Sequence, residues 1–124
     1  MKFLLLVAHG SRRDASNDEI RILAKRLQTM SHPFKEIDCA FLEIARPSIY
    51  EALQRFIVIG AKDIVVLPYF LSAGRHVTMD IPEQVEQVKN QYPNVKIDIV
   101  SYLGASEMIA ELVMQLAFEK SSAI

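Results

Sequence analysis

Tryptophan is absent from this 124-residue sequence, and cysteine occurs once, at Cys39. A single cysteine excludes an intramolecular disulfide, so a reducing compartment such as the cytoplasm is expected. No apolar run approaches the roughly 20 residues that a membrane-spanning helix needs. The apolar stretch at the amino terminus is also too short for a signal peptide. We therefore expect a soluble cytoplasmic protein that does not enter a membrane.

An excess of either charge is also absent. Fourteen basic and 15 acidic residues leave a net charge of -1, which gives no general attraction to nucleic acid or to anionic lipid. Hydrophobic residues make up 51% of the sequence, a proportion typical of a globular protein rather than a disordered one. The length predicts a single domain over residues 1–124. Recognition of a charged ligand must therefore come from a local cluster of side chains.

One apolar run dominates the sequence that is present. The six residues Phe3–Ala8 are too few for an amphipathic helix of ordinary length, and they are typical of a strand buried on both faces. The polar turn His9-Gly10-Ser11 follows directly. In open parallel sheets, ligands bind at the carboxyl ends of the strands. The position of His9 therefore predicts that its ring faces a site.

Strand and helix patterns alternate along the whole chain. Strands are expected at 3–8, 36–42, 64–67 and 95–100, and helices at 16–30, 47–60, 80–92 and 105–118. This order predicts an α/β fold, a three-layer α/β/α sandwich around a four-stranded parallel sheet. The alternation of apolar and charged residues over 95–100 places the last strand at an edge.

Several residues mark where the helices are expected to begin. Ser16 with Glu19 forms a capping-box pattern, and Asp80 with Glu83 forms a similar one. Pro47 suits the first turn of the second helix. Each helix would therefore begin shortly after the carboxyl end of a strand.

In this fold, His9, Glu43 and the loop that carries His76 all lie at one edge of the sheet. Two imidazoles and a carboxylate can bind a divalent transition metal, or they can accept protons near neutral pH. Taken singly, each has another interpretation. His9 could bond to its own turn, His76 could be a solvated loop residue, and Glu43 could cap the following helix. The dispersed spacing alone is a weak metal signal.

Four arginines, Arg12, Arg13, Arg46 and Arg75, lie beside the same turns. A single surface arginine carries little information. Four at one edge of a net-negative protein predict a cationic collar for carboxylates or phosphates, and the helix amino termini add positive potential there. We expect an anionic ligand.

At this point the motifs resemble a known family, the CbiX/SirB-type sirohydrochlorin chelatases, which are class II, ATP-independent tetrapyrrole chelatases. The resemblance covers nearly the whole chain in the same order. It rests on residues 7–12 (VAHGSR), 41–49 (FLEIARPSI), 73–77 (AGRHV) and 80–82 (DIP).

The resemblance implies insertion of Co²⁺, or alternatively Fe²⁺ or Ni²⁺, into sirohydrochlorin for cobalamin or sirohaem-type biosynthesis. It aligns His9 and His76 with the two active-site histidines, as metal ligands and proton acceptors, and Glu43 with an acidic position. No cofactor beyond the substrate metal is implied. The chain has about half the length of the two-lobed members, so a homodimer with the cleft between subunits is implied. It lacks the histidine-rich segment and the cysteine-rich tail of some short members.

The residues themselves suggest how the macrocycle would be held. Arg12, Arg46 and Arg75, with Ser11, are the candidates for binding its peripheral carboxylates, which would fix its orientation.

Three other functions remain as rivals. A metal- or tetrapyrrole-binding carrier would bind the same ligands without catalysis. A histidine phosphatase has an arginine before its His-Gly, where this chain has Ala8. A receiver-type signalling module needs an aspartate after the third strand, where this chain has Pro68.

Overall fold

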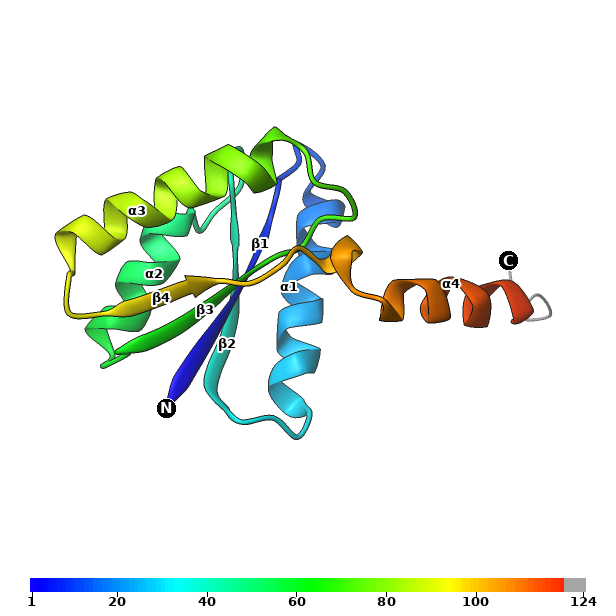
Figure 1. Cartoon of the computed structure of the whole chain (residues 1–124), viewed down its shortest axis with the longest axis horizontal. Coiled ribbons are helices and arrows are strands. Elements are labelled where there is room, and N and C mark those ends of the chain that lie inside the picture. Colours follow the sequence, from blue (N-terminus) through cyan, green and yellow to red (C-terminus); the bar gives the residue numbers. More distant parts are fainter. Residues whose placement is uncertain (120–124) are drawn as a thin grey trace.

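A computed structural model of the chain describes residues 1–119. Its centre is a parallel sheet with the strand order β2-β1-β3-β4 (Figure 1). The strands are β1 (Lys2–Ala8), β2 (Phe34–Phe41), β3 (Asp63–Pro68) and β4 (Lys96–Ile99). β1 therefore has a neighbour on each side, and β4 lies at the edge that its alternating sequence predicts.

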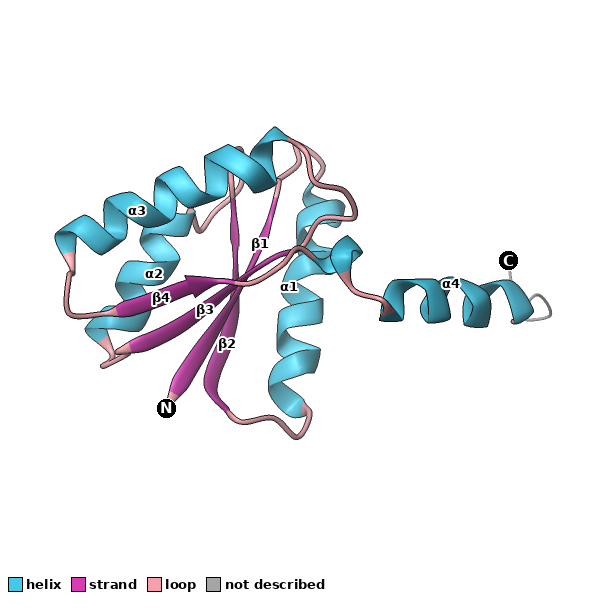
Figure 2. Ribbon diagram, in the orientation of Figure 1, coloured by secondary structure: helices cyan, strands magenta, loops and turns pink. Residues whose placement is uncertain are grey.

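Helices cover both faces of the sheet. The helices are α1 (Asp14–Thr29), α2 (Ile49–Val58), α3 (Ile81–Gln91) and α4 (Met108–Phe118). α2 and α3 lie on one face and α1 lies on the other (Figure 2). The predicted α/β fold with three layers is confirmed.

The first strand is buried on both faces, as its unbroken apolar sequence predicts. Phe3, Leu5 and Val7 belong to the larger core with α2 and α3. Leu6 and Ala8 belong to a smaller core under α1. Successive side chains of a strand point to opposite faces, so one short run contributes to both cores.

Several backbone amides along the outer edge of β2 are hydrogen-bonded. Three of its outward amides are hydrogen-bonded outside the sheet ladder. The pairs are Ile37 N–H to Gln28 Oε1 at 2.6 Å, Cys39 N–H to Asp38 Oδ1 at 2.8 Å, and Phe41 N–H to the Pro47 carbonyl at 2.9 Å. An edge strand whose amides are bonded in this way is less open to pairing with another chain.

The first helix begins earlier than the sequence predicts. Its N-cap is Arg13, and Ser16 lies inside the first turns, so the predicted capping box of Ser16 and Glu19 is wrong. The Ser11 hydroxyl oxygen instead accepts a hydrogen bond from the Arg13 amide at 3.0 Å. The Ser11 hydroxyl, just outside the helix, thus takes the role that the sequence predicts for the Ser16 hydroxyl.

The second helix has the capping box that the first one lacks. Ser48 is the N-cap, and its side chain and that of Glu51 each accept a hydrogen bond from the other's backbone amide. Pro47, which follows a cis peptide bond, precedes the helix instead of lying in its first turn. Gly60 follows the last residues of the helix with a φ of 105° and donates to the Ile57 carbonyl, as expected of a glycine at a helix end.

The third helix is preceded by a π-helical turn, η1 (His76–Asp80), which runs directly into it. Asp80 therefore has helical angles, φ -70° and ψ -44°, and its side chain makes no cap hydrogen bond. The prediction that Asp80 caps this helix is wrong. The carboxylate binds a histidine instead, as described below.

The last helix stands away from the other elements (Figure 1). A short 3-10 turn, η2 (Leu103–Ala105), occupies its predicted beginning, and α4 begins only at Met108. No residue of α4 is buried. Across residues 1–119, no helix combines the length and apolar character needed to cross a bilayer.

Candidate active site

Three polar side chains meet where neighbouring strands end. His9 follows β1 directly, Glu43 lies two residues after β2, and His76 begins η1 after β3. Because β1 lies between β2 and β3, the three segments are adjacent at the carboxyl edge of the sheet. The structure thus brings together the three residues that the sequence singled out.

The first contact joins His9 to Glu43. His9 Nε2 lies 3.4 Å from Glu43 Oε1, and the Glu43 amide donates to the His9 carbonyl at 3.1 Å. Glu43 does not cap α2, because Ser48 and Glu51 do so. The carboxylate therefore remains available to the histidine.

A glycine allows this contact. Gly10 has a φ of 98°, which favours glycine, and a Cβ at this position would lie 1.9 Å from the Glu43 carbonyl oxygen. Ile44, just after Glu43, also has a positive φ, of 73°. A left-handed non-glycine residue is strained, and such residues are frequent at functional sites.

The second contact joins His76 to Asp80. His76 Nδ1 lies 2.7 Å from Asp80 Oδ2, one turn further along the helix. The π-helical geometry of η1 is the kind of local irregularity that is common at functional sites. His76 is therefore held by a carboxylate and is not a free loop residue.

Both rings are held through the same nitrogen. His9 Nδ1 lies 2.9 Å from the Gly10 carbonyl oxygen, which can only accept, so the proton is on Nδ1. His76 Nδ1 donates in the same way to the Asp80 carboxylate. A neutral imidazole that donates from Nδ1 carries its lone pair on Nε2. Each neutral ring thus presents an Nε2 lone pair that can bind a metal or accept a proton. The lone pair of His9 faces the Glu43 carboxylate at 3.4 Å, and a shared metal ion or proton would stabilise this pair of acceptors.

The three groups are close but do not form a closed cage. One ligand atom from each of His9, Glu43 and His76 lies within 4.8 Å of the others, and the two ring centroids are 4.6 Å apart. Two ligands about 2.1 Å from one ion are at most about 4.2 Å apart, so small rotations would bring all three onto one ion. Their side chains are 43%, 55% and 40% exposed. The cluster is open to a ligand that arrives from solvent.

The predicted anion-binding residues differ in how far they are already engaged. Arg12 and Arg75 are exposed and form no ion pair with any residue in the described part of the chain. Arg46 pairs with Glu51, and this carboxylate raises the pKa of the guanidinium. Ser11 accepts from the Arg13 amide and keeps its hydroxyl proton to donate. Arg12 and Arg75 are the cations most available to a ligand.

Two residues of the site were not found from the sequence. The sequence pattern predicts Asp80 as a helix cap, although its spacing of four residues from His76 on a helix indicates a contact between the two side chains. Asn17 is buried, and its amide bonds both the amide and the carbonyl of Ser11, at 2.9 and 2.7 Å. It fixes the turn that follows His9. Nothing in the helical pattern around Asn17 distinguishes it.

An acidic hollow adjoins the cluster. A cavity of about 510 Å³ is lined by Leu42, Glu43, Asp80, Glu83, Gln84 and Gln87. The two carboxylates that contact the histidines, those of Glu43 and Asp80, therefore also face this hollow. Its acidic lining favours a cation over an anionic ligand.

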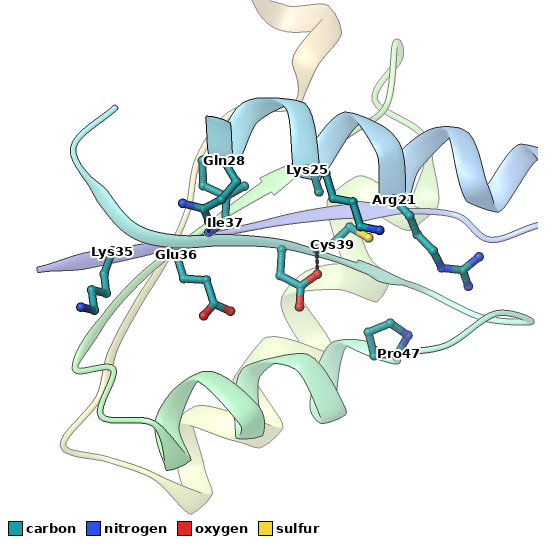
Figure 3. Close-up of a pocket in the computed structure, with 10 residues that line it drawn as sticks. Arg21, Lys25, Gln28, Lys35, Glu36, Ile37, Cys39 and Pro47 are labelled. Atoms are coloured by element: carbon teal, nitrogen blue, oxygen red, sulfur yellow. Dashed lines mark hydrogen bonds between the residues drawn. The ribbon is translucent and has the colours of Figure 1, made fainter. Parts of the chain in front are cut away.

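Another hollow lies at the edge of β2 and includes none of these residues. It has a volume of about 580 Å³ and is bounded by α1, with Arg21 and Lys25 near Cys39 (Figure 3). Burial raises the pKa of Cys39 to about 11, so its thiol stays protonated. A protonated, buried thiol is no nucleophile, and Cys39 serves as a small apolar side chain of the core.

Comparison with known proteins gives consistent matches. A family model described as CbiX matches residues 3–120. A sirohydrochlorin cobaltochelatase of Sulfurisphaera tokodaii is 35% identical over 112 residues, which are 90% of this chain and 88% of that protein. A sirohydrochlorin cobaltochelatase of Priestia megaterium is 30% identical over 115 residues, 90% of this chain but only 36% of its own length.

One solved structure that matches is the sirohydrochlorin chelatase SirB of Bacillus subtilis subspecies spizizenii, in complex with cobalt. It is 27% identical, with a TM-score of 0.82, over 95% of this chain and 50% of that one. The chain thus spans half or less of its longer relatives, and nearly all of a short one.

Proposed function

Because the chain belongs to the CbiX family, we propose that it inserts a divalent metal ion into sirohydrochlorin without ATP. The product would serve cobalamin or sirohaem-type tetrapyrrole biosynthesis. The observation that carries the proposal is the pair of half-exposed imidazoles, both held at Nδ1, beside the Glu43 carboxylate.

Insertion requires two changes at the macrocycle. The metal exchanges its water ligands for ring nitrogens, and two pyrrole N–H protons leave. His9 and His76 would bind the arriving metal through Nε2 and then accept the protons as the metal passes to the macrocycle. Glu43, 3.4 Å from His9, would orient that ring or take the second proton. An open cluster suits this role, because the ion must leave again.

The peripheral carboxylates of the macrocycle would be held by Arg12 and Arg75, with Ser11 donating its hydroxyl proton. Arg46 would contribute only by exchanging Glu51 for a substrate carboxylate. These contacts orient the macrocycle over the histidines, so their effect is on proximity.

The metal is proposed to be Co²⁺, with Fe²⁺ or Ni²⁺ as alternatives. Imidazole and carboxylate ligands bind all three ions, and affinity in proteins follows a general order that does not identify the cellular metal. Relatives with cobalt and with Fe3+ bound are known, both of them SirB proteins of Bacillus subtilis.

We further propose that residues 1–124 act as one lobe of a homodimer in the cytoplasm. The chain matches half of the SirB chain, and a single lobe leaves the second face of the macrocycle open to water. The unpaired, buried Cys39 suits a reducing compartment. The net charge of -1 supports neither a nucleic-acid nor a membrane partner.

The test is a visible-absorbance assay of Co²⁺ insertion into sirohydrochlorin with His9→Ala and His76→Ala. Each variant is expected to lose roughly 100-fold or more of the rate, within the range for a lost acid-base group. His32→Ala, at the far end of α1, is the matched control and should keep full activity. Full activity in both site variants would disprove the assignment. Tight binding of metal or macrocycle without any rate acceleration would favour the carrier.

A further inference from the structure

Helix α4 is apolar over most of its circumference and lies in solvent; Glu111 and Gln115, four residues apart, form a narrow polar stripe. Five large apolar side chains between Leu112 and Phe118 are 48% to 82% exposed, and Met108 is 71% exposed. A helix packs its apolar side against another surface, and here that side is wide. In a water-soluble chain this helix therefore needs a partner surface.

One face of the sheet is only partly covered by helices. α2 and α3 cover one face, whereas the other is covered by α1 alone, over β1 and β2. On this second face, Leu67 packs only at the margin of the smaller core. Val65 has the same orientation two residues earlier, and both remain partly exposed. The strip of β3 beside α1 thus lacks the helix that a four-helix sandwich would place there.

The segment before α4, which comprises η2 and Ser106, is anchored at the point where the chain leaves its own sheet. The Gly104 amide donates to the Phe70 carbonyl at 2.9 Å, and a Cβ at Gly104 would lie 1.8 Å from the Leu71 carbonyl oxygen. The Ser106 side chain and carbonyl then accept from the amides of Met108 and Ile109, at 3.2 and 3.1 Å. Close packing and hydrogen bonds therefore hold the beginning of α4 at the point where the chain leaves its own sheet.

The surface available is large enough for a stable dimer. Full burial of one such side chain removes roughly 60–120 Å² of apolar surface, the area implied by the usual transfer energies. Because a helix packs on a sheet with one side only, about four of the six side chains of each helix would be buried. Two helices, with the surfaces that receive them, then give roughly 1,000–1,900 Å². Stable protein interfaces bury about 1,600 Å² in total.

We propose that α4 of each chain packs on the sheet of a second copy, over Val65 and Leu67 beside α1. The exchange is reciprocal and completes the fourth helix position in both subunits. It supplies the physical means for the homodimer of the proposed function, on which it rests.

Two full-length variants separate the two sides of this contact. Leu112→Glu combined with Leu116→Glu alters the helix, and Val65→Glu alters the receiving strand. Val58→Glu is the control, because Val58 is an exposed apolar residue of α2 away from both surfaces. Association is measured by sedimentation equilibrium without metal or tetrapyrrole, and circular dichroism monitors folding.

The wild type and the Val58→Glu control are expected to be dimers, and each of the other variants to dissociate about 100-fold more readily. An equimolar mixture of the two variants should associate at least about 10-fold more tightly than either alone, because one intact helix then meets one intact sheet. Should Val65→Glu not fold, Val65→Thr keeps the branched shape and should weaken association about 10-fold.

A monomeric wild type, a sheet variant that dimerises like the wild type, or a mixture no tighter than its parents would overturn the exchange. A dimer that behaves as expected but inserts no metal would count against the proposed function alone.

Discussion

At the scale of single residues, the two imidazoles differ in the group that holds them. His9 donates to the neutral carbonyl of Gly10, and His76 donates to the charged carboxylate of Asp80. A carboxylate behind a histidine fixes the ring and strengthens it as a metal ligand. His76 is therefore expected to be the stronger of the two metal ligands.

Replacing Asp80 by Asn removes the charge and keeps the shape. We expect the affinity for Co²⁺ to fall roughly 10- to 100-fold, as for other lost outer partners of metal-binding histidines. Isothermal titration with Co²⁺ measures this. Glu83→Gln is the matched control, because Glu83 lines the same hollow and touches neither histidine. Equal losses in both variants would mean that only the general acidity of the hollow matters.

Gly10→Ala should damage the contact between His9 and Glu43. The new Cβ would meet the Glu43 carbonyl oxygen, and the left-handed backbone would be strained by about 2 kcal/mol. We expect a lower unfolding midpoint in urea and a lower insertion rate. Gly74→Ala has open space around its Cβ and should resemble the wild type. A Gly10→Ala protein of unchanged stability and rate would show that the turn can relax at no cost.

The sequence predicted which side chains meet at the edge of the sheet better than it predicted the residues that support them. His9, Glu43 and His76 follow strands, and parallel pairing brings strand ends together whatever lies between them. Asp80 was misplaced because an acidic residue before an apolar helix usually caps it, whereas here a π-turn extends the helix past it. The role of Asn17 depends on the path of the Ser11 turn, which no local pattern reveals.

At the scale of elements, the Glu51 side chain both caps the beginning of α2 and pairs with a surface arginine. Glu51 accepts from the Ser48 amide in the capping box of α2 and pairs with Arg46. The hydrogen bond from Arg46 is the main reason why the pKa of Glu51 falls to about 2, from 4.5. The carboxylate therefore stays ionised in the native state until the solution is strongly acidic.

Because the pKa of Glu51 is lower in the folded state, its ionised form stabilises the protein above pH 4.5. This contribution is lost as the pH falls from 4.5 to about 2. Glu51→Gln should therefore be less stable than the wild type at neutral pH, and the two should converge towards pH 2. Urea midpoints across this range measure the difference. Glu86→Gln, on exposed α3 surface, should differ little at any pH, and a similar convergence there would contradict the explanation.

The strands were easier to predict than the starts of the helices. Burial fixes an apolar run such as Phe3–Ala8, so its sequence is nearly sufficient. A helix start depends on which of several nearby hydroxyls and carboxylates bonds the first amides. At α1, the Ser11 hydroxyl accepts from the Arg13 amide, and the helix begins before Ser16. The separation of α4 was not foreseen, because an apolar helical pattern does not specify which sheet it covers.

At the scale of the whole molecule, the two faces of the sheet are unequally covered. α1 alone protects one face, and the apolar side chains of α4 face water. Much of the apolar surface that could stabilise the fold is thus available only on association. Stability and oligomerisation should therefore be linked.

The thermal midpoint of the wild type should consequently rise with protein concentration, by mass action on a dimer. The doubly substituted Leu112→Glu, Leu116→Glu chain should melt at a lower temperature that does not depend on concentration. Scanning calorimetry over a dilution series measures both. A wild-type midpoint that is constant over the series would contradict the link.

The hydrogen bonds along the flank of β2 bear on the kind of assembly that is open to this protein. With the amides of Ile37, Cys39 and Phe41 already engaged, that flank offers an approaching strand fewer free amides to pair with. Backbone pairing repeats without limit and leads to fibres, whereas side-chain contacts end once their shapes are matched. Strand-by-strand growth at this flank is therefore disfavoured, whereas association through the side chains of α4 would end in a finite particle.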